Sequence, residues 1–196
     1  MQSEQEEEFQ AFVRARWTHL VRTAYLLTGD PHDAEDLTQT ALAKAYRSWR
    51  RVLRSERPEA YVRRMLVTCN SDRFRKRRVR ERLTGAPPDT AARPDAGLAW
   101  AGERSALMRA LAELPPRQRA VVVLRYWDDL AESEVAAALG CSPGTVKSQS
   151  SKGLAKLRAH PGLAQVWDGA GGDGPGPAEA DRYARVATTT ERGVRR

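Results

Sequence analysis

Residues 142–158 combine a helix start signal with a face of hydrogen-bonding and cationic side chains. Ser142 is a preferred N-cap and Pro143 fits the first helical position, so a helix is predicted to begin here. Its apolar face would hold Val146, Ser150, Leu154 and Leu157. The opposite face carries Ser142, Thr145, Lys147, Ser148, Gln149, Ser151, Lys152 and Lys156. That face suits the DNA major groove, because lysines reach phosphates and guanine edges while hydroxyls and amides hydrogen-bond other bases.

A second, shorter helix is predicted just before it, over residues 132–139. Val135, Ala136 and Leu139 would face inward, and Gly140 can adopt the positive φ of a sharp turn. Together the two segments form a helix-turn-helix. A helical hairpin with a merely solvated polar face is the alternative, but turn chemistry, capping and surface composition agree on DNA binding.

A second cationic feature lies in the first half of the chain, where residues 73–82 read RFRKRRVRER. An isolated helix of this sequence would repel itself, so an anionic partner is expected. A solvated face or a disordered basic arm is the alternative. Tyr61 and Phe74 lie in or near the run, and aromatic rings beside a cationic track can stack on unpaired bases. For Trp49, also nearby, a place in the hydrophobic core is favoured over a base platform.

Three amphipathic helices are predicted to position this basic run. The first has an apolar face of Phe9, Phe12, Val13, Leu20, Ala24 and Leu27 and stops at Gly29. The second begins with Asp30 as N-cap, Pro31 at the first helical position and Asp33 three residues after the cap. Its apolar face runs through Ala34, Leu37, Ala41, Ala45 and Trp49. After a basic loop over 50–57, a third helix starts at Pro58 and buries Val62, Met65, Leu66 and Cys69.

Charge and cysteine content narrow the class of protein. The 196-residue chain has a formal net charge of +8, which favours nucleic acid as partner ahead of an anionic membrane surface. Cys69 and Cys141 lie far apart in apolar helical contexts, so they are expected to be core thiols in a reducing compartment. No apolar run approaches the roughly 20 residues of a membrane span, and the acidic start differs from a signal peptide. We therefore expect a cytoplasmic protein without membrane insertion.

The composition along the chain predicts an all-α fold of two small helical domains joined by a flexible linker. The first domain would cover residues 1–83 and the second, with the helix-turn-helix, residues 104–159. The linker over 84–103 and a largely disordered tail over 160–196 are rich in glycine and proline. Two domains of this size bury modest cores, and such domains are often steadied by a partner.

No catalytic constellation competes with nucleic-acid binding. The three histidines lack metal-ligand spacing, and neither a phosphate-binding glycine loop nor a nucleophile motif is present. We expect neither enzymatic activity nor a metal or cofactor.

Two long blocks, in this order, resemble the extracytoplasmic-function (group IV) sigma factors of the sigma-70 family. DPHDAEDLTQTALAKAYRSW followed by RPEAYVRRMLVTCNSDRFRKRR is similar to region 2, and LPPRQRAVVVLRYWDDLAESEVAAALGCSPGTVKSQSSKGLAKLR is similar to region 4. The GTVKSQ form of the second helix most resembles a SigE-like actinobacterial subgroup. The resemblance implies a subunit that binds core RNA polymerase, at the β′ clamp and β flap, and directs promoter-specific initiation.

The resemblance also assigns roles to residues. Asp33, Asp36 and Gln39 correspond to the segment that binds the polymerase β′ clamp. The helix from Ser142 to Arg158 corresponds to the reader of the −35 element. The loop over 50–57 and the helix from Tyr61 to Arg78 correspond to the parts that open the −10 element and flip a base into a pocket. In these parts the −10 candidates are Arg57, Tyr61, Arg64, Thr68, Arg73, Phe74, Arg75, Arg77 and Arg78.

This chain departs from the family pattern at three of these positions. Family members usually carry asparagine where Thr68 stands, and Asn70 would point elsewhere on the helix, so the resemblance does not specify the flipped base. Many relatives have arginines at the positions of Gln149 and Lys152, which implies a different −35 sequence. The resemblance also implies an anti-sigma protein as a possible partner, with the tail as an alternative regulator.

Two other functions remain open from the sequence. A stand-alone helix-turn-helix regulator would bind specific DNA without polymerase. A basic nucleic-acid-binding scaffold would bind without sequence preference and with strong salt dependence.

Overall fold

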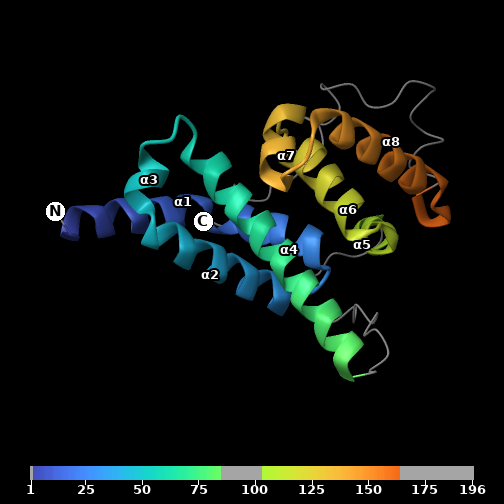
Figure 1. The fold of residues 1–196 in the computed structure, drawn as a ribbon, viewed down its shortest axis with the longest axis horizontal. Helices are drawn as coiled ribbons and strands as arrows, with labels where there is room; N and C mark the ends of the chain where they lie inside the picture. The colour runs from blue at the N-terminus through green and yellow to red at the C-terminus, as the bar shows by residue number, and fades with distance from the viewer. Residues whose placement is uncertain (1, 85–102, 164–196) are drawn as a thin grey trace, which may run out of the picture.

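All regular structure that the computed structural model describes, over residues 2–84 and 103–163, is helical (Figure 1). Its segments are α1 (Gln2–Thr28), α2 (Pro31–Arg47), α3 (Trp49–Leu53), α4 (Pro58–Thr84), α5 (Glu103–Glu113), α6 (Pro116–Val122), the π-helical turn η1 (Val123–Trp127), α7 (Glu132–Leu139), α8 (Pro143–Ala159) and the 3-10 turn η2 (Pro161–Leu163). The predicted all-α fold is confirmed. Residues 85–102 of the predicted linker and 164–196 of the predicted tail lie outside the described residues.

The N-terminal domain consists of α1–α4 around an aromatic-rich core. Asp30 caps α2, since its side chain accepts a hydrogen bond from the Asp33 backbone N–H at 2.8 Å, and Pro31 opens the helix as predicted. Trp49 is only 1% exposed, with its ring centroid 5.1 Å from those of both Phe9 and Phe12. The expectation that Trp49 belongs to the hydrophobic core is confirmed.

The predicted basic loop over 50–57 is partly helical, so that expectation was wrong over its first residues. The short helix α3 occupies Trp49–Leu53 and buries Trp49 and Val52, which stand three positions apart on one face. Arginines between them gave the segment the composition of a loop. The helix forms because its two large apolar side chains are drawn into the core of the domain.

The C-terminal domain, α5–η2, packs around a small cluster of buried aliphatic side chains. Leu111 and Leu114 of α5 and its C-terminal extension meet Val122 of α6 and Leu157 of α8 in this cluster. Leu163 joins it at 5% exposure, so ordered packing continues past residue 159, where the domain was predicted to end. The helices α6 and α8 approach closely at Gly153, because a Cβ there would lie 2.7 Å from Val122 Cγ2.

We expect Gly153→Val to lower the free energy of unfolding by about 1–3 kcal/mol through overpacking against Val122. The control is Ala155→Val on the exposed side of the same helix, which carries the β-branched residue without the clash. Urea unfolding of both variants measures the difference. Equal loss of stability in the two would show that close packing at Gly153 is unimportant.

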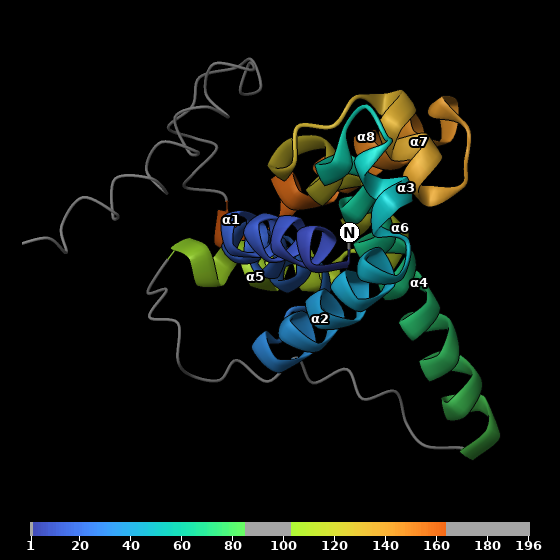
Figure 2. The same ribbon diagram turned by 90° about the vertical axis from the view of Figure 1, so that its left-hand side faces the viewer.

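The two domains lie against each other rather than apart (Figures 1 and 2). Helix α4 contacts α7, and α1 contacts both α6 and η1. One continuous cluster of buried side chains includes Leu27 and Val67 from the N-terminal domain and Val121 and Leu124 from the C-terminal one. The sequence did not predict this packing. In both views the C-terminal end of α4 projects away from the rest of the molecule.

Among the helices in the described ranges, none has the length and apolar character needed to cross a membrane.

Candidate nucleic-acid interface

The turn between α7 and α8 has the geometry that the sequence predicts. Gly140 adopts a left-handed conformation with φ of 61° and ψ of 46° and ends α7 at Leu139. Ser142 then caps α8, as its Oγ accepts a hydrogen bond from the Thr145 backbone N–H at 3.2 Å. The helix-turn-helix is therefore built from local signals on both sides of the turn.

The polar face of α8 is accessible. Val146, Ser150, Gly153 and Leu157 are buried against the domain, while Leu154 is half-buried. On the other side Ser142, Lys147, Ser148, Ser151, Lys152 and Lys156 are exposed, and Thr145 and Gln149 are half-buried. The structure thus brings all eight residues of the predicted −35 set onto one side of one helix. Their contacts with DNA stay a prediction.

Some polar groups of this face are already used within the protein. Ser142 Oγ lies 2.9 Å from Thr145 Oγ1, and Ser148 Oγ donates to the Thr145 carbonyl at 3.0 Å. On the buried side Ser150 Oγ lies 3.0 Å from the Tyr126 hydroxyl, which ties α8 to η1. The exposed Lys147 and Lys152 and the half-buried Gln149 lie on the same face, outside these contacts.

The outer face of α4 carries a second group of candidates. Arg64 and Thr68 are exposed one helical turn apart, and Thr68 Oγ1 donates to the Arg64 carbonyl at 2.8 Å. Asn70 is 4% exposed, and its Oδ1 has no hydrogen-bond partner. It points into the domain, as its place on the helix predicts. The side chain at position 68 faces the solvent instead.

Five of the remaining −10 candidates fall into three groups. Tyr61 is half-buried against the cluster around Trp49, and Phe74 is half-buried as well. Arg75 is exposed and pairs with Asp72 at 3.0 Å. The side chains of Arg77 and Arg78 lie outside the described residues, although α4 continues through both positions.

Two other arginines of the −10 set are engaged by acidic residues of other elements. Arg73 pairs with Asp33 of α2, and its Nη1 also donates to the Asp33 carbonyl at 3.3 Å. Arg57 Nη1 lies 2.5 Å from Glu134 Oε1 of α7, in the other domain. Helical spacing does not predict either pair, because both join residues distant along the chain.

The residues expected to bind polymerase lie along α2. Asp36 and Gln39 are exposed on its outer face. Asp33 is half-buried, and its carboxylate pairs with Arg73. Asp36 and Gln39 are therefore accessible to a partner, whereas Asp33 would have to exchange its contact with Arg73.

The two domains match two different parts of one family. Residues 12–80 match sigma-70 region 2, and residues 104–157 match sigma-70 region 4. With the relatives below, these matches show that the chain belongs to the sigma-70 family of RNA polymerase sigma factors, in its extracytoplasmic-function group. Sigma factors direct promoter-specific initiation of transcription, so the predicted class of protein is confirmed.

Within this family the similarity is to SigE-like members. The chain is 42% identical over 151 residues to the RNA polymerase sigma-E factor of Streptomyces antibioticus, covering 77% of this chain and 83% of that protein. It is 35% identical to the ECF RNA polymerase sigma factor SigE of Mycolicibacterium smegmatis, covering 74% of this chain and 58% of that protein. The fold is similar, with a TM-score of 0.64 and 24% identity, to the sigma factor RpoE of Bartonella quintana in complex with the anti-sigma factor NepR, covering 78% and 96% of the two chains.

Proposed function

We propose that the two exposed helical surfaces described above divide promoter recognition between them. Helix α8 reads the −35 element in duplex form, with Lys147, Gln149 and Lys152 as its principal contacts. The outer face of α4 binds the −10 element as its strands separate, and Arg64, Thr68 and Arg75 line that face. The observation that carries this proposal is the accessible polar face of α8 above a buried Val146, Ser150 and Leu157.

Because the two domains are linked in one chain, each of them needs only a weak contact with its own promoter element. When one domain has bound, the other is held at a high effective concentration near its own element. Core RNA polymerase fixes the two domains in register, and Asp36 and Gln39 of α2 are exposed for that contact. The sigma factor itself then needs no catalytic group, and we propose that it acts as a non-enzymatic, cytoplasmic initiation subunit.

An anti-sigma protein is a further proposed partner. The solved sigma factors of similar fold include RpoE with NepR and CnrH with the cytosolic domain of CnrY. A protein of that class would compete with core polymerase for the same exposed helices.

Run-off transcription with core polymerase tests the proposal. Wild-type protein is expected to produce transcript from a cognate promoter selected out of a genomic pool, and core polymerase alone is not. The matched comparison is Thr68→Asn, which preserves a polar side chain on the exposed face of α4. This variant is expected to change the preferred −10 sequence and leave the −35 preference unchanged. Absence of any transcript with the wild-type protein would contradict the function.

The alternative of a stand-alone helix-turn-helix regulator is not favoured. It leaves the N-terminal domain without a role, whereas that domain matches sigma-70 region 2 over residues 12–80. Co-sedimentation with core polymerase separates the two, because a stand-alone regulator would not bind the enzyme.

A further inference from the structure

The middle of the buried face of α8 carries only small side chains. The large buried residues of that face, Val146 and Leu157, lie near its two ends. Between them stand Ser150, which is 7% exposed, and Gly153, which has no side chain. Apolar packing is not directional, so these contacts constrain the rotation of α8 about its own axis only loosely. A directional contact in the middle of the helix is needed to fix that angle.

A hydrogen bond between two hydroxyl groups supplies such a contact. Ser150 Oγ lies 3.0 Å from the hydroxyl oxygen of Tyr126 in η1. Helices α6 and α8 lie side by side (Figure 1), and η1 continues directly from α6, so Tyr126 reaches α8 from the neighbouring helix. A hydrogen bond weakens steeply away from its preferred distance and angle. The bond between Tyr126 and Ser150 therefore resists rotation of α8.

The π-helical turn η1 places Tyr126 where it can make this bond. Residues 120–124 are all buried, whereas Tyr126 is 48% exposed. The wider turn is seen in the backbone, because the Asp128 N–H donates to the Val123 carbonyl at 3.1 Å, five residues back. The guanidinium carbon of Arg125 lies 6.0 Å from the centroid of the Tyr126 ring, and this contact limits the motion of the ring. Single π-helical turns are rare and frequently occur at functional sites.

This hydrogen bond contributes more to orientation than to stability. Tyr126 is exposed, so water competes for its hydroxyl and the net stabilisation is small. Phenylalanine at 126 would keep the apolar contacts of the ring. Alanine at 150 would fit the same buried position and favours the helix more than serine does. The hydroxyl pair is therefore not needed to hold the domain together, and its distinct contribution is the angle of α8.

The rotation of α8 determines where its DNA-facing side chains lie. With side chains included, a helix has a radius of about 5–6 Å, so a rotation of about 10° moves a side-chain end by about 1 Å. A binding constellation must be held within about 0.5 Å of its productive geometry. Gln149 and Ser151 flank Ser150 in the sequence and project about 100° to either side of it. A change in the angle of α8 would therefore displace them, together with Lys152, relative to the base edges.

We propose that Tyr126 is a positioning residue for promoter recognition: its hydrogen bond to Ser150 sets the rotation of α8 and thereby the discrimination among −35 sequences. This inference rests on the proposed reading of the −35 element by α8. Tyr126 acts through Ser150 and does not itself contact a base. Specificity thus depends on a serine of the buried side of α8 as well as on the side chains that face DNA.

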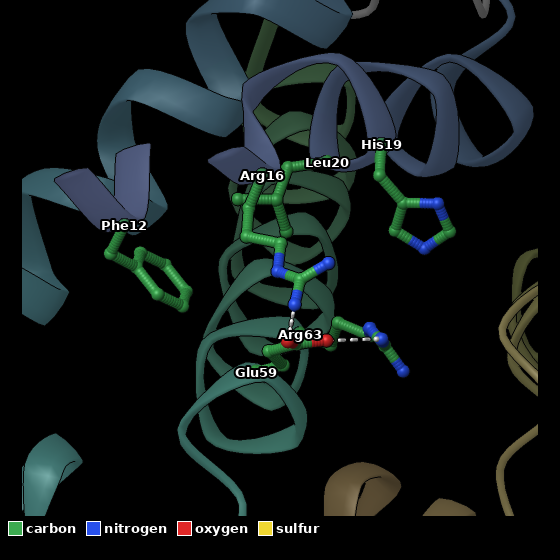
Figure 3. Close-up of a pocket in the computed structure, with 6 residues that line it drawn as sticks. All are labelled: Phe12, Arg16, His19, Leu20, Glu59 and Arg63. Carbon is green, nitrogen blue, oxygen red and sulfur yellow. Dashed lines mark hydrogen bonds and ion pairs between the residues drawn. The ribbon is translucent and has the colours of Figure 1, made fainter. Parts of the chain in front are cut away.

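Removal of either hydroxyl tests the proposal in the holoenzyme formed with core polymerase. Tyr126→Phe and Ser150→Ala each delete one oxygen and leave the apolar packing in place. The control, Arg16→Gln, breaks a polar contact between two other helices, since Arg16 of α1 pairs with Glu59 of α4 (Figure 3). Transcription is measured on promoters in which each −35 position is varied singly around the sequence that the wild-type holoenzyme prefers.

A good base contact discriminates against a wrong base pair by about 5- to 150-fold. The wild-type and Arg16→Gln holoenzymes are expected to show the same discrimination. Tyr126→Phe and Ser150→Ala are each expected to lose about 5-fold of it at one or more −35 positions, with −10 discrimination unchanged. The double variant should lose no more than either single variant, because both substitutions break the same bond. Circular dichroism at the assay temperature checks that each variant is folded.

Three results would overturn the positioning role. An equal loss of transcription on every −35 sequence would mean that the bond only stabilises the domain. A loss of discrimination in Tyr126→Phe but not in Ser150→Ala would mean that the tyrosine hydroxyl contacts DNA directly. Unchanged discrimination in both variants would mean that other contacts set the angle of α8. Absence of any −35 preference in the wild-type holoenzyme is a different result, because it contradicts the proposed reading by α8 itself.

Discussion

Reversing the charges of Lys147 and Lys152 together is expected to reduce transcription from a −35-dependent promoter by about 30-fold or more. Both lysines are exposed on the outer face of α8. A good contact to a base is worth about 1–3 kcal/mol, and a glutamate there would also repel the phosphates. Two such losses total at least about 2 kcal/mol, which corresponds to a factor of about 30 in binding, at 1.4 kcal/mol for each tenfold change. Run-off transcription with the Lys147→Glu, Lys152→Glu variant measures the effect.

The matched control places the same charge change outside the proposed reading surfaces, at Arg14→Glu with Arg117→Glu. Both arginines are exposed, one on α1 and the other on α6. This control is expected to retain most of the wild-type activity. Equal loss in the two variants would mean that net charge, rather than the α8 face, carries the interaction. Core-polymerase binding should be unchanged by the α8 substitutions.

Trp49→Ala is expected to lower the free energy of unfolding of the N-terminal domain by about 3–5 kcal/mol. The indole is 1% exposed and lies against Phe9 and Phe12, so its removal leaves a cavity between α1 and α3. Domains of this size have little stability to lose, so much of the variant should be unfolded. Thermal or urea unfolding followed by circular dichroism measures the change.

The conservative variant Trp49→Phe distinguishes packing from a base-stacking role. The Trp49 Nε1–H is buried without a hydrogen-bond partner, so phenylalanine removes an unsatisfied donor and keeps most of the apolar volume. Its stability should lie much closer to wild type than that of Trp49→Ala. If Trp49→Ala instead unfolds like the wild type and loses only DNA binding, the core assignment is wrong.

Helix limits set by local signals were predicted well from the sequence. Asp30 and Ser142 each accept a hydrogen bond from the backbone three residues on, and each precedes a proline at the first helical position. These interactions involve only neighbouring residues, so their pattern is visible without tertiary structure. The same holds for Gly140, whose positive φ follows from the need for a sharp turn.

Features that depend on distant partners were not predicted. Helix α3 lies in an arginine-rich segment, and only the burial of Trp49 and Val52 in the assembled domain favours it. Glycine is unfavourable inside a helix, and the presence of Gly153 in α8 is explained only by the close approach of Val122 of α6. Contacts between the domains, such as that of Asp128 with His19, join residues more than a hundred positions apart. Helical periodicity along one segment carries no information about them.

Helix α4 is continuous from Pro58 to Thr84, and this fixes the distances between the side chains that are proposed to bind melted DNA. A continuous helix of 27 residues is about 40 Å long, and Arg64 and Arg75 are separated along its axis by about 16 Å. A continuous helix fixes both the angular position of each side chain around its axis and the spacing of the side chains along that axis. One inserted residue between them would rotate every later side chain by about 100°. The length of the promoter segment that α4 is proposed to bind therefore depends on the helix pitch as much as on the identity of its side chains.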